Sequence, residues 1–205
     1  MSLPSRLLGA NPSIQVSTLL SGSLSTPSAK GAFFDTHYES ISTTTVNTEA
    51  VDSVTFSNIP NFYSHLQVRI FARSTRPYGG NAVDGLNLIA NNTAVTKSHH
   101  MLGDGGTVTV GNDYPIIFFP DDGAGIAGAY GGAIIDILDY SNLNKNKTYR
   151  ALAGFDNNSS SAPGSVTLNS GFFGSTSAIT SLTFTFQYGG IIKQYSQFAL
   201  YGIRG

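Results

Sequence analysis

The stretch from Asn58 to Arg73, NIPNFYSHLQVRIFAR, decides the fold. From Ser64 onward its side chains alternate, and four apolar residues share one side: Leu66, Val68, Ile70 and Ala72. A period of two is typical of a β-strand with one face on a core and the other in water or at an interface. Pro60 has no amide hydrogen and favours an extended residue before it, so we expect the strand to follow a fixed corner.

Similar segments recur along the rest of the chain, between turns rich in glycine, asparagine and proline. The pattern predicts strands over residues 38–46, 51–56, 64–75, 85–90, 93–102, 106–110, 114–119, 133–140, 148–155, 166–173, 179–186 and 194–203. No window places apolar residues three and four apart over the length of a helix. Short strands separated by turn signals indicate an all-β domain over residues 35–205, a two-sheet antiparallel sandwich of the jelly-roll kind.

The composition indicates a folded protein and argues against a nucleic-acid-binding one. The 205 residues fit one domain with an additional arm. Only 11% of the residues are charged but 40% are hydrophobic, which is unlike the composition of disordered chains. The formal net charge of -1 provides no positive field of the kind that nucleic-acid-binding proteins use, so we expect no nucleic-acid partner.

The sequence contains no membrane or export signal that we can identify. No apolar run reaches the roughly 18 residues of a membrane span, and residues 1–8 are too polar for a secretory signal. We therefore expect neither a membrane span nor secretion. With zero cysteines, the fold uses no disulfide and no cysteine-bound zinc, which is compatible with assembly in a cytosol.

Residues 1–34 differ from the rest of the chain. The segment is broken by prolines and glycines, and its large apolar residues include Leu7, Leu8, Ile14, Val16, Leu19, Leu20 and Leu24. An isolated segment cannot offset its own ordering entropy of about 1–2 kcal/mol per residue. We expect an extended N-terminal arm whose apolar side chains dock on another subunit. A floppy terminus with incidental leucines is the alternative.

One glycine motif invites a cofactor interpretation. Residues 123–128 read GAGIAG and match the G-x-G-x-x-G pattern of dinucleotide sites. Such a site needs its third glycine to open a helix whose amide groups hold the pyrophosphate. Further glycines and then a predicted strand follow here. We interpret the motif as a surface loop and expect no cofactor.

The histidines and acids show no metal-site spacing. His99 and His100 are adjacent, and adjacent side chains on a strand point to opposite faces, so they cannot easily share one metal. Four aspartates could supply oxygen ligands to Ca²⁺, namely Asp121, Asp122, Asp136 and Asp139. Their spacing fits no calcium loop, and such acids more often form turns or solvate strand ends. We expect no metal site.

The chain also lacks a recognisable catalytic constellation. It has no cysteine nucleophile, no G-x-S-x-G elbow and only two glutamates, Glu39 and Glu49. Asp136 and Asp139 stay open as a carboxylate pair of the kind that glycosidases use, but nothing in the pattern singles them out. We expect that the protein is not an enzyme.

A cationic and aromatic strip follows the polar side of the central predicted strand. It contains Arg69, Phe71, Arg73 and Arg76. Such a strip can bind acidic sugars, nucleic acid or a protein partner, and the near-zero net charge makes nucleic acid the weakest of these. The alternative is that the arginines form ion pairs with acids on neighbouring strands.

Several segments resemble a family of tailed-bacteriophage virion proteins. They read YESI at 38–41, VTFSNIP at 54–60, YSHLQVR at 63–69, DILDY at 136–140, NKNKT at 144–148 and YSQFALYGI at 195–203. The resemblance covers residues 38–205 but not the arm, and it implies a β-sandwich module of the particle, on heads, tails or fibres. No catalytic residues carry over. The family's usual Asn-Gly-Asp segment is replaced here by LIANNT at 88–93.

The resemblance leaves two functions open. The first is a capsid decoration, or cement, protein that docks through its arm. It would act in the virion, be assembled in the host cytoplasm, and have other virion proteins as partners. Such a protein would form a homo-oligomer, a trimer being one arrangement. The second is a tail or neck fibre domain that binds host-surface glycans through loop aromatics, with Tyr130, Phe172 and Phe173 as candidates.

Overall fold

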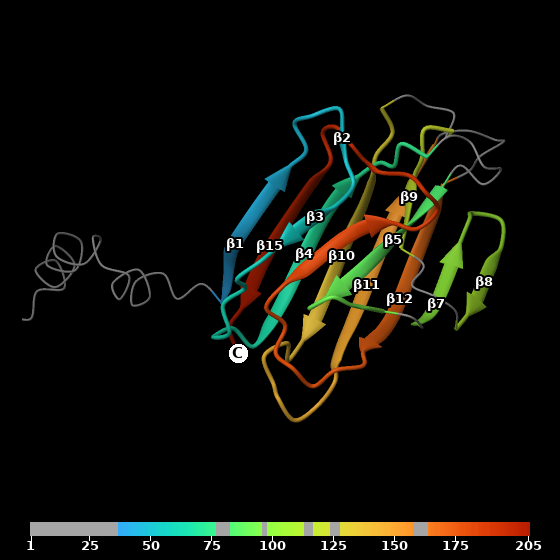
Figure 1. Cartoon of the computed structure of the whole chain (residues 1–205). Coiled ribbons are helices and arrows are strands. Elements are labelled where there is room, and N and C mark those ends of the chain that lie inside the picture. Colours follow the sequence, from blue (N-terminus) through green and yellow to red (C-terminus); the bar gives the residue numbers. More distant parts are fainter. Residues whose placement is uncertain (1–36, 77–82, 96–97, 113–116, 124–127, 158–163) are drawn as a thin grey trace, which may run out of the picture. The chain divides into compact units, whose positions relative to one another are not determined.

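The computed structural model describes residues 37–76, 83–95, 98–112, 117–123, 128–157 and 164–205 (Figure 1). The predicted docking arm, residues 1–34, lies outside the described residues, and so do all seven of its candidate docking residues. The compact unit that contains the strands runs from Tyr38 to Gly205. The part of the chain that the structure describes contains strands and turns and no helix.

The larger sheet has eight antiparallel strands. In spatial order they are β1 (Tyr38–Thr45), β15 (Gln197–Ile203), β4 (His65–Ala72), β10 (Gly131–Leu138), β11 (Lys147–Phe155), β12 (Ser165–Phe173), β7 (Ser98–Gly103) and β8 (Val108–Gly111). The first and last strands of the described chain therefore lie beside each other, and β15 joins β1 to the central strand β4.

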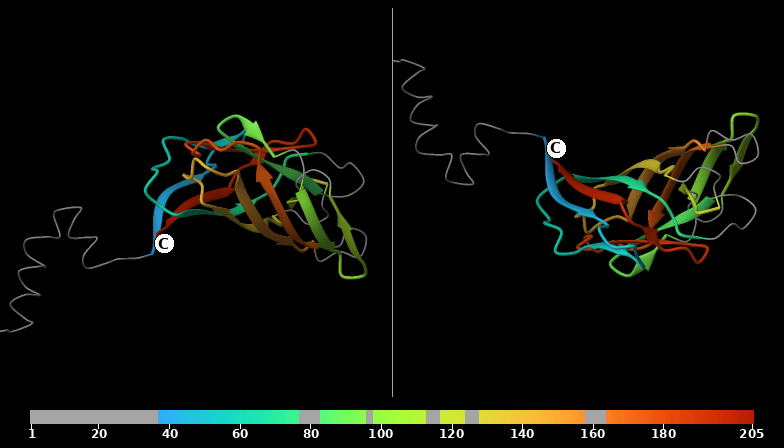
Figure 2. Two further views of the ribbon diagram at one scale, coloured as in Figure 1. Left: turned by 90° about the horizontal axis from the view of Figure 1, so that it is seen from below. Right: turned by 90° about the horizontal axis from the view of Figure 1, so that it is seen from above.

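The smaller sheet lies over one face of the larger one (Figures 1 and 2). Its strands are β3 (Val54–Phe56), β13 (Leu182–Phe186), β5 (Val83–Ala90) and β6 (Thr93–Ala94), and β9 (Phe118–Pro120) pairs with β5. The short strands β2 (Ala50–Val51) and β14 (Ile192–Lys193) form a separate pair.

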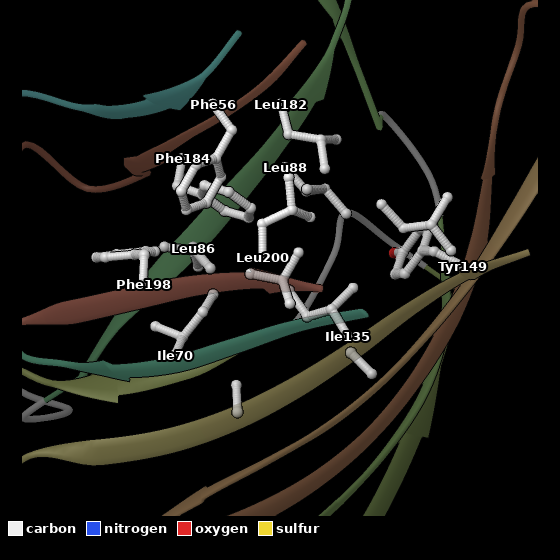
Figure 3. Close-up of a cluster of buried hydrophobic side chains, with 14 of the residues drawn as sticks. Phe56, Ile70, Leu86, Leu88, Ile135, Tyr149, Leu182, Phe184, Phe198 and Leu200 are labelled. Carbon is white, nitrogen blue, oxygen red and sulfur yellow. The ribbon is translucent and has the colours of Figure 1, made fainter. Parts of the chain in front are cut away.

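The core lies between these two sheets (Figure 3). Phe184 of β13 and Phe198 of β15 come from opposite layers, and their ring centroids are 5.4 Å apart. On β4, the four residues predicted to face inward are all buried: Leu66, Val68, Ile70 and Ala72. The predicted all-β, two-sheet antiparallel sandwich is thereby confirmed, because the period-two pattern of β4 matches the face that the second sheet covers.

Some predicted strands are shorter than expected. Residues 64–75 were predicted as one strand, but β4 ends at Ala72. The segment 194–203 becomes a turn followed by β15, because Tyr195 adopts a φ of 68°, a left-handed conformation that does not occur within a strand. Similarly, 51–56 is divided between β2 and β3, and 93–102 between β6 and β7.

The β1 edge of the larger sheet is irregular. The pairing of β1 with β15 shifts by one residue between Ser40 and Ser42, which is the signature of a β-bulge. The opposite edge of this sheet is β8, a strand of only four residues.

The segment that departs from the family pattern, 88–93, forms the tight turn between β5 and β6. Asn91 and Asn92 occupy its two central positions with φ values of 46° and 65°, as a primed hairpin turn requires. Asn91 also anchors the chain before β13. Its Oδ1 accepts hydrogen bonds from the Thr180 amide at 2.9 Å and the Ser181 amide at 3.1 Å, and its Nδ2 donates to the Ala178 carbonyl at 2.7 Å.

We expect Asn91→Ala to lower the free energy of unfolding by about 1–3 kcal/mol, because backbone amides and a carbonyl lose their side-chain partner. Urea unfolding monitored by circular dichroism measures the change. Asn92→Ala is the matched control, since the exposed Asn92 has the same left-handed backbone. Equal losses from the two variants would contradict a special role for the Asn91 side chain.

Candidate functional site

The outer face of the larger sheet, on the side away from the core, carries a row of exposed apolar side chains. Cross-strand pairing places five residues in one line across β10, β11, β12, β7 and β8: Ile134, Leu152, Leu168, Met101 and Val110. Each of these residues is at least 41% exposed. We call this line the apolar row. A contiguous apolar surface of this kind is a candidate interaction site.

A second line of cross-strand neighbours lies on the same face, two residues along the strands from the apolar row, and contains two glycines. Gly132 of β10 pairs with Gly154 of β11, Phe71 of β4 pairs with Gly132, and Val166 of β12 pairs with Gly154. We call these four residues the glycine row. Phe71 and Val166 are more than half exposed, at 51% and 61%. Because the two glycines have no side chains, the face is hollowed between them.

That hollow has a volume of about 510 Å³. The glycine row contributes Gly132, Gly154 and Val166 to its lining, and the apolar row contributes Ile134 and Leu152. Arg69 is the one charged residue of the lining. A hollow lined in this way suits an apolar side chain or a closely approaching backbone better than a charged ligand.

A polar line borders the apolar row on its other side. Gln67, Asp136 and Arg150 lie directly opposite one another on β4, β10 and β11. Gln67 Nε2 donates to Asp136 Oδ1 at 2.8 Å, and Arg150 Nη2 lies 3.8 Å from Asp136 Oδ2. We call this line, which continues through Ser170 and His99, the polar row. The outer face therefore changes from polar to apolar within one step of the strand repeat.

On β12 the usual pattern of polarity is reversed. Val166 and Leu168 are 61% and 55% exposed, whereas Thr167 and Asn169 between them are each only 1% exposed. The buried amide of Asn169 is satisfied, because the Tyr149 hydroxyl donates to its Oδ1 at 2.6 Å and its Nδ2 donates to Ser98 Oγ at 2.9 Å. A slip of one residue would bury the apolar pair and expose the polar pair. The observed register therefore leaves the apolar pair on the outer face.

The predicted cationic strip is only partly assembled. Arg69 and Phe71 lie on the outer face of β4, next to the apolar and glycine rows. The Arg69 guanidinium lies 5.4 Å from the ring centroids of both Tyr38 and Tyr201, and these two rings stack at 4.7 Å. Burial raises the pKa of the Tyr38 hydroxyl, partly offset by the Arg69 charge. These contacts fix Arg69 at the border of the apolar surface.

Phe71 and Tyr130, which the sequence assigned to different candidate sites, lie together. Their rings stack with centroids 5.0 Å apart and an interplanar angle of 15°. The Tyr130 hydroxyl donates to the Gln194 carbonyl at 2.5 Å, and burial raises the pKa of this hydroxyl. Tyr130 therefore supports the exposed Phe71 ring.

Including Arg73 in the exposed strip is wrong. β4 ends before this residue, so the alternation does not continue, and Arg73 is only 2% exposed. Its Nε lies 3.1 Å from Asp122 Oδ1, and its Nη1 donates to the Ala129 carbonyl at 2.6 Å. Lys193 also pairs with Asp122. Burial raises the pKa of Asp122, but hydrogen bonds from Lys193 and Arg73 outweigh it and lower the value. For Arg73, the alternative interpretation applies: this arginine forms an ion pair with an acid of the same chain.

Arg76 lies beyond the end of the strand and has local partners. Its Nη1 donates to the Val83 carbonyl at 2.7 Å, and its guanidinium lies 4.9 Å from the Tyr188 ring centroid. It is therefore not part of the Arg69–Phe71 surface.

The predicted loop aromatics do not form one site. Phe172 and Phe173 are in β12 rather than in a loop. Phe172 is 54% exposed, but Phe173 is 1% exposed, and its ring centroid lies 5.9 Å from that of buried Tyr149. The assignment of Phe173 as a surface contact is wrong, because successive strand residues point to opposite faces.

The other sequence candidates stay separate. His99 is exposed on the outer face of β7, and its neighbour His100 is only partly exposed. Among the described residues, no three histidine or acidic side chains gather where they could hold a metal ion. Of the G-x-G-x-x-G motif, Gly123 and Gly128 are described, and residues 124–127 lie outside the described residues. No helix long and apolar enough to span a membrane occurs in the described ranges.

Sequence reasoning missed the apolar row. The signal was present in β12, where apolar and small polar residues alternate as Val-Thr-Leu-Asn, but the pattern alone suggested that the apolar residues face the core. In β11, buried Ala151 and Ala153 flank the exposed Leu152, so the pattern does not show which of these apolar residues face the core.

Comparison with known proteins gives no further assignment, since no protein-family model, curated protein or solved structure matches this chain.

Proposed function

We propose that this chain is a non-enzymatic structural subunit of a tailed-bacteriophage virion that decorates the outside of the capsid and binds protein partners. The observation that carries the proposal is the exposed apolar surface on the outer face of the larger sheet, formed by the apolar and glycine rows. Burying apolar area of this kind contributes about 25 cal/mol per Å². In β12 the strand register itself places Val166 and Leu168 on this surface, so their exposure follows from the fold.

The sequence of the N-terminal segment supports a docking role. Residues 1–34 contain two charged residues, Arg6 and Lys30, beside the seven large apolar residues named above. A segment of this composition can reach a neighbouring protein while the sandwich presents its outer face to another partner. The low charge of the whole chain fits a subunit that works within a packed assembly.

The glycan-binding alternative has less support. It relied on Tyr130, Phe172 and Phe173 as loop contacts, and these residues do not converge. Tyr130 supports Phe71, Phe172 lies on a strand face, and Phe173 is buried. Sugar recognition commonly needs aromatic faces and polar groups converging in one site.

Quantitative mass spectrometry of purified virions tests the proposal. We expect on the order of hundreds of copies per particle, because a symmetric shell repeats each docking site many times. A count of a few to a few dozen copies would place the protein on the tail or neck instead, and its absence from the particle would refute a virion role.

The same particles test the arm. Particles lacking the protein are incubated with the full chain, with residues 35–205 alone, and with a full-length variant carrying Leu19→Ser and Leu20→Ser. We expect the full chain to bind and both altered proteins to bind much more weakly. Undiminished binding by residues 35–205 would show that the arm is not the anchor.

A further inference from the structure

We propose that two copies of this chain pair through the outer faces of their larger sheets, about a two-fold axis that runs along the strands between β10 and β11. This inference rests on the proposed function, which makes the outer face a protein-binding surface, and it names a second copy of the chain as the partner. Three neighbouring rows of the sheet carry it, each chemically matched to its own two-fold image.

The polar row gives the clearest argument, because it is charge-complementary to itself. Asp136 on β10 and Arg150 on β11 lie directly opposite each other in one chain. The proposed axis passes between these strands, so it places Asp136 against the partner's Arg150 and Arg150 against the partner's Asp136. Acids and bases would then alternate around a four-membered cluster. Opposite charges across an interface fix its register and disfavour other alignments.

The apolar row has the same symmetry. The axis brings Ile134 against the partner's Leu152 and Leu152 against the partner's Ile134. These side chains are 41% and 53% exposed in one chain, and they lie nearest the axis, where an interface is driest. Leu168, further along the row, is placed against the partner's Arg69, whose aliphatic stem it can cover. The arrangement therefore has a small apolar centre with charged groups around it.

The glycine row explains how the two faces can come close. Gly132 and Gly154 are adjacent to the axis, so each faces the other glycine of the partner. Packed sheets ordinarily lie about 10 Å apart, and the absence of side chains allows a closer approach here. Within one chain, a Cβ on Gly132 would meet no heavy atom within 4 Å. The monomer's own packing therefore does not require glycine at this position.

The extent of the surface favours a broad partner over a peptide. The three rows cross β4, β10, β11, β12, β7 and β8, and Phe172 extends the face at one end. Together they supply about 15 residues, whereas an interface of standard size takes roughly 20–30 from each partner. A bound peptide strand would contact only part of these residues.

Light scattering during size-exclusion chromatography of the full-length chain tests the pairing. The chain has a mass of 21.6 kDa, and we expect twice this mass at micromolar concentration. Leu152→Glu should yield the monomer mass, with self-association at least tenfold weaker, because it places a carboxylate at the apolar centre. The matched control is Leu143→Glu, since Leu143 is 67% exposed but lies in the turn between β10 and β11.

Two further sets of variants separate loss of pairing from misfolding. Gly132→Arg adds a side chain where the monomer has space, so we expect a folded monomer by circular dichroism. Asp136→Arg alone should weaken the pair by placing like charges together, and so should Arg150→Asp alone. Mixing the two single variants should restore pairing, because opposite charges then meet only between chains while each chain keeps like charges within itself. Restoration on mixing would not occur if the charges served only the fold of a single chain.

Cross-linking tests the position of the proposed two-fold axis. The chain has zero cysteines, so single thiols can be placed without background. A mixture of Ile134→Cys and Leu152→Cys proteins should be joined by a short bismaleimide, while a mixture of Ile134→Cys and Leu143→Cys should not. A wild-type monomer at tens of micromolar, or an oligomer that Leu152→Glu leaves intact, overturns the pairing.

The two proposals can fail separately. A protein that pairs as described but is absent from virions refutes the virion role alone. A protein that is abundant in virions but monomeric in solution, with no cross-link between positions 134 and 152, refutes the pairing alone.

Discussion

Phe184→Ala is expected to lower the free energy of unfolding by about 3–5 kcal/mol, the range for removing a fully buried phenylalanine. Phe184 is 0% exposed on β13 and packs against rings from both layers. Its centroid lies 5.4 Å from that of Phe198 in the larger sheet and 6.2 Å from that of Phe56 in the smaller one. The substitution leaves a cavity at the contact between the sheets.

Urea unfolding of both proteins measures the change. Phe172→Ala removes the same atoms from a side chain that is 54% exposed, so it is the matched control, with an expected loss of about 1 kcal/mol or less. If both variants lose the same stability, the sheets are not held together as the structure shows.

The second large effect is a loss of stability at alkaline pH through Tyr149. Burial raises the pKa of the Tyr149 hydroxyl from 10.0 to about 12, although a hydrogen bond with Ser98 acts in the opposite direction. Between these values the folded state keeps a proton that the unfolded state has lost, so stability falls as the pH rises. The contribution is fully present below pH 10 and declines by roughly 2–3 kcal/mol by pH 12.

Comparison of the wild type with Tyr149→Phe isolates this contribution. At pH 8 the variant should be less stable by about 1–2 kcal/mol, because the buried Asn169 Oδ1 loses its hydrogen bond from the Tyr149 hydroxyl. The variant should also lose less stability than the wild type between pH 9 and 12. Urea unfolding across this range should therefore give two stability curves whose separation at pH 8 closes as the pH rises. Parallel curves would show that Tyr149 ionises as easily in the folded protein as in the unfolded chain.

The fold was predictable where one face of a strand is apolar and the other is not. On β4, Leu66, Val68 and Ile70 were predicted to face the core, and they do. Strand ends were less predictable, because they depend on single backbone conformations. The left-handed φ of Tyr195 interrupts a segment whose side chains read as a continuous strand, and nothing in the residue type requires that conformation.

The candidate site was less predictable than the fold. Arg69 and Phe71 were assigned to the outward side of β4 and lie there, but Arg73, beyond the end of the strand, is buried by contacts with Asp122 and Ala129. The apolar row could not be found from alternation alone. In β12, burial of Asn169 depends on hydrogen bonds with Tyr149 and Ser98, which are distant in sequence. Only tertiary partners reveal that Leu168 faces outward.

The bulge between Ser40 and Ser42 affects how further chains can add to the edge of the larger sheet. A regular edge strand presents an unbroken ladder of amide and carbonyl groups on which further chains can add and grow into fibrils. The shifted register in β1 interrupts that ladder. At the opposite edge, the four residues of β8 offer a template too short for extended growth. Both edges of the larger sheet therefore disfavour sideways polymerisation.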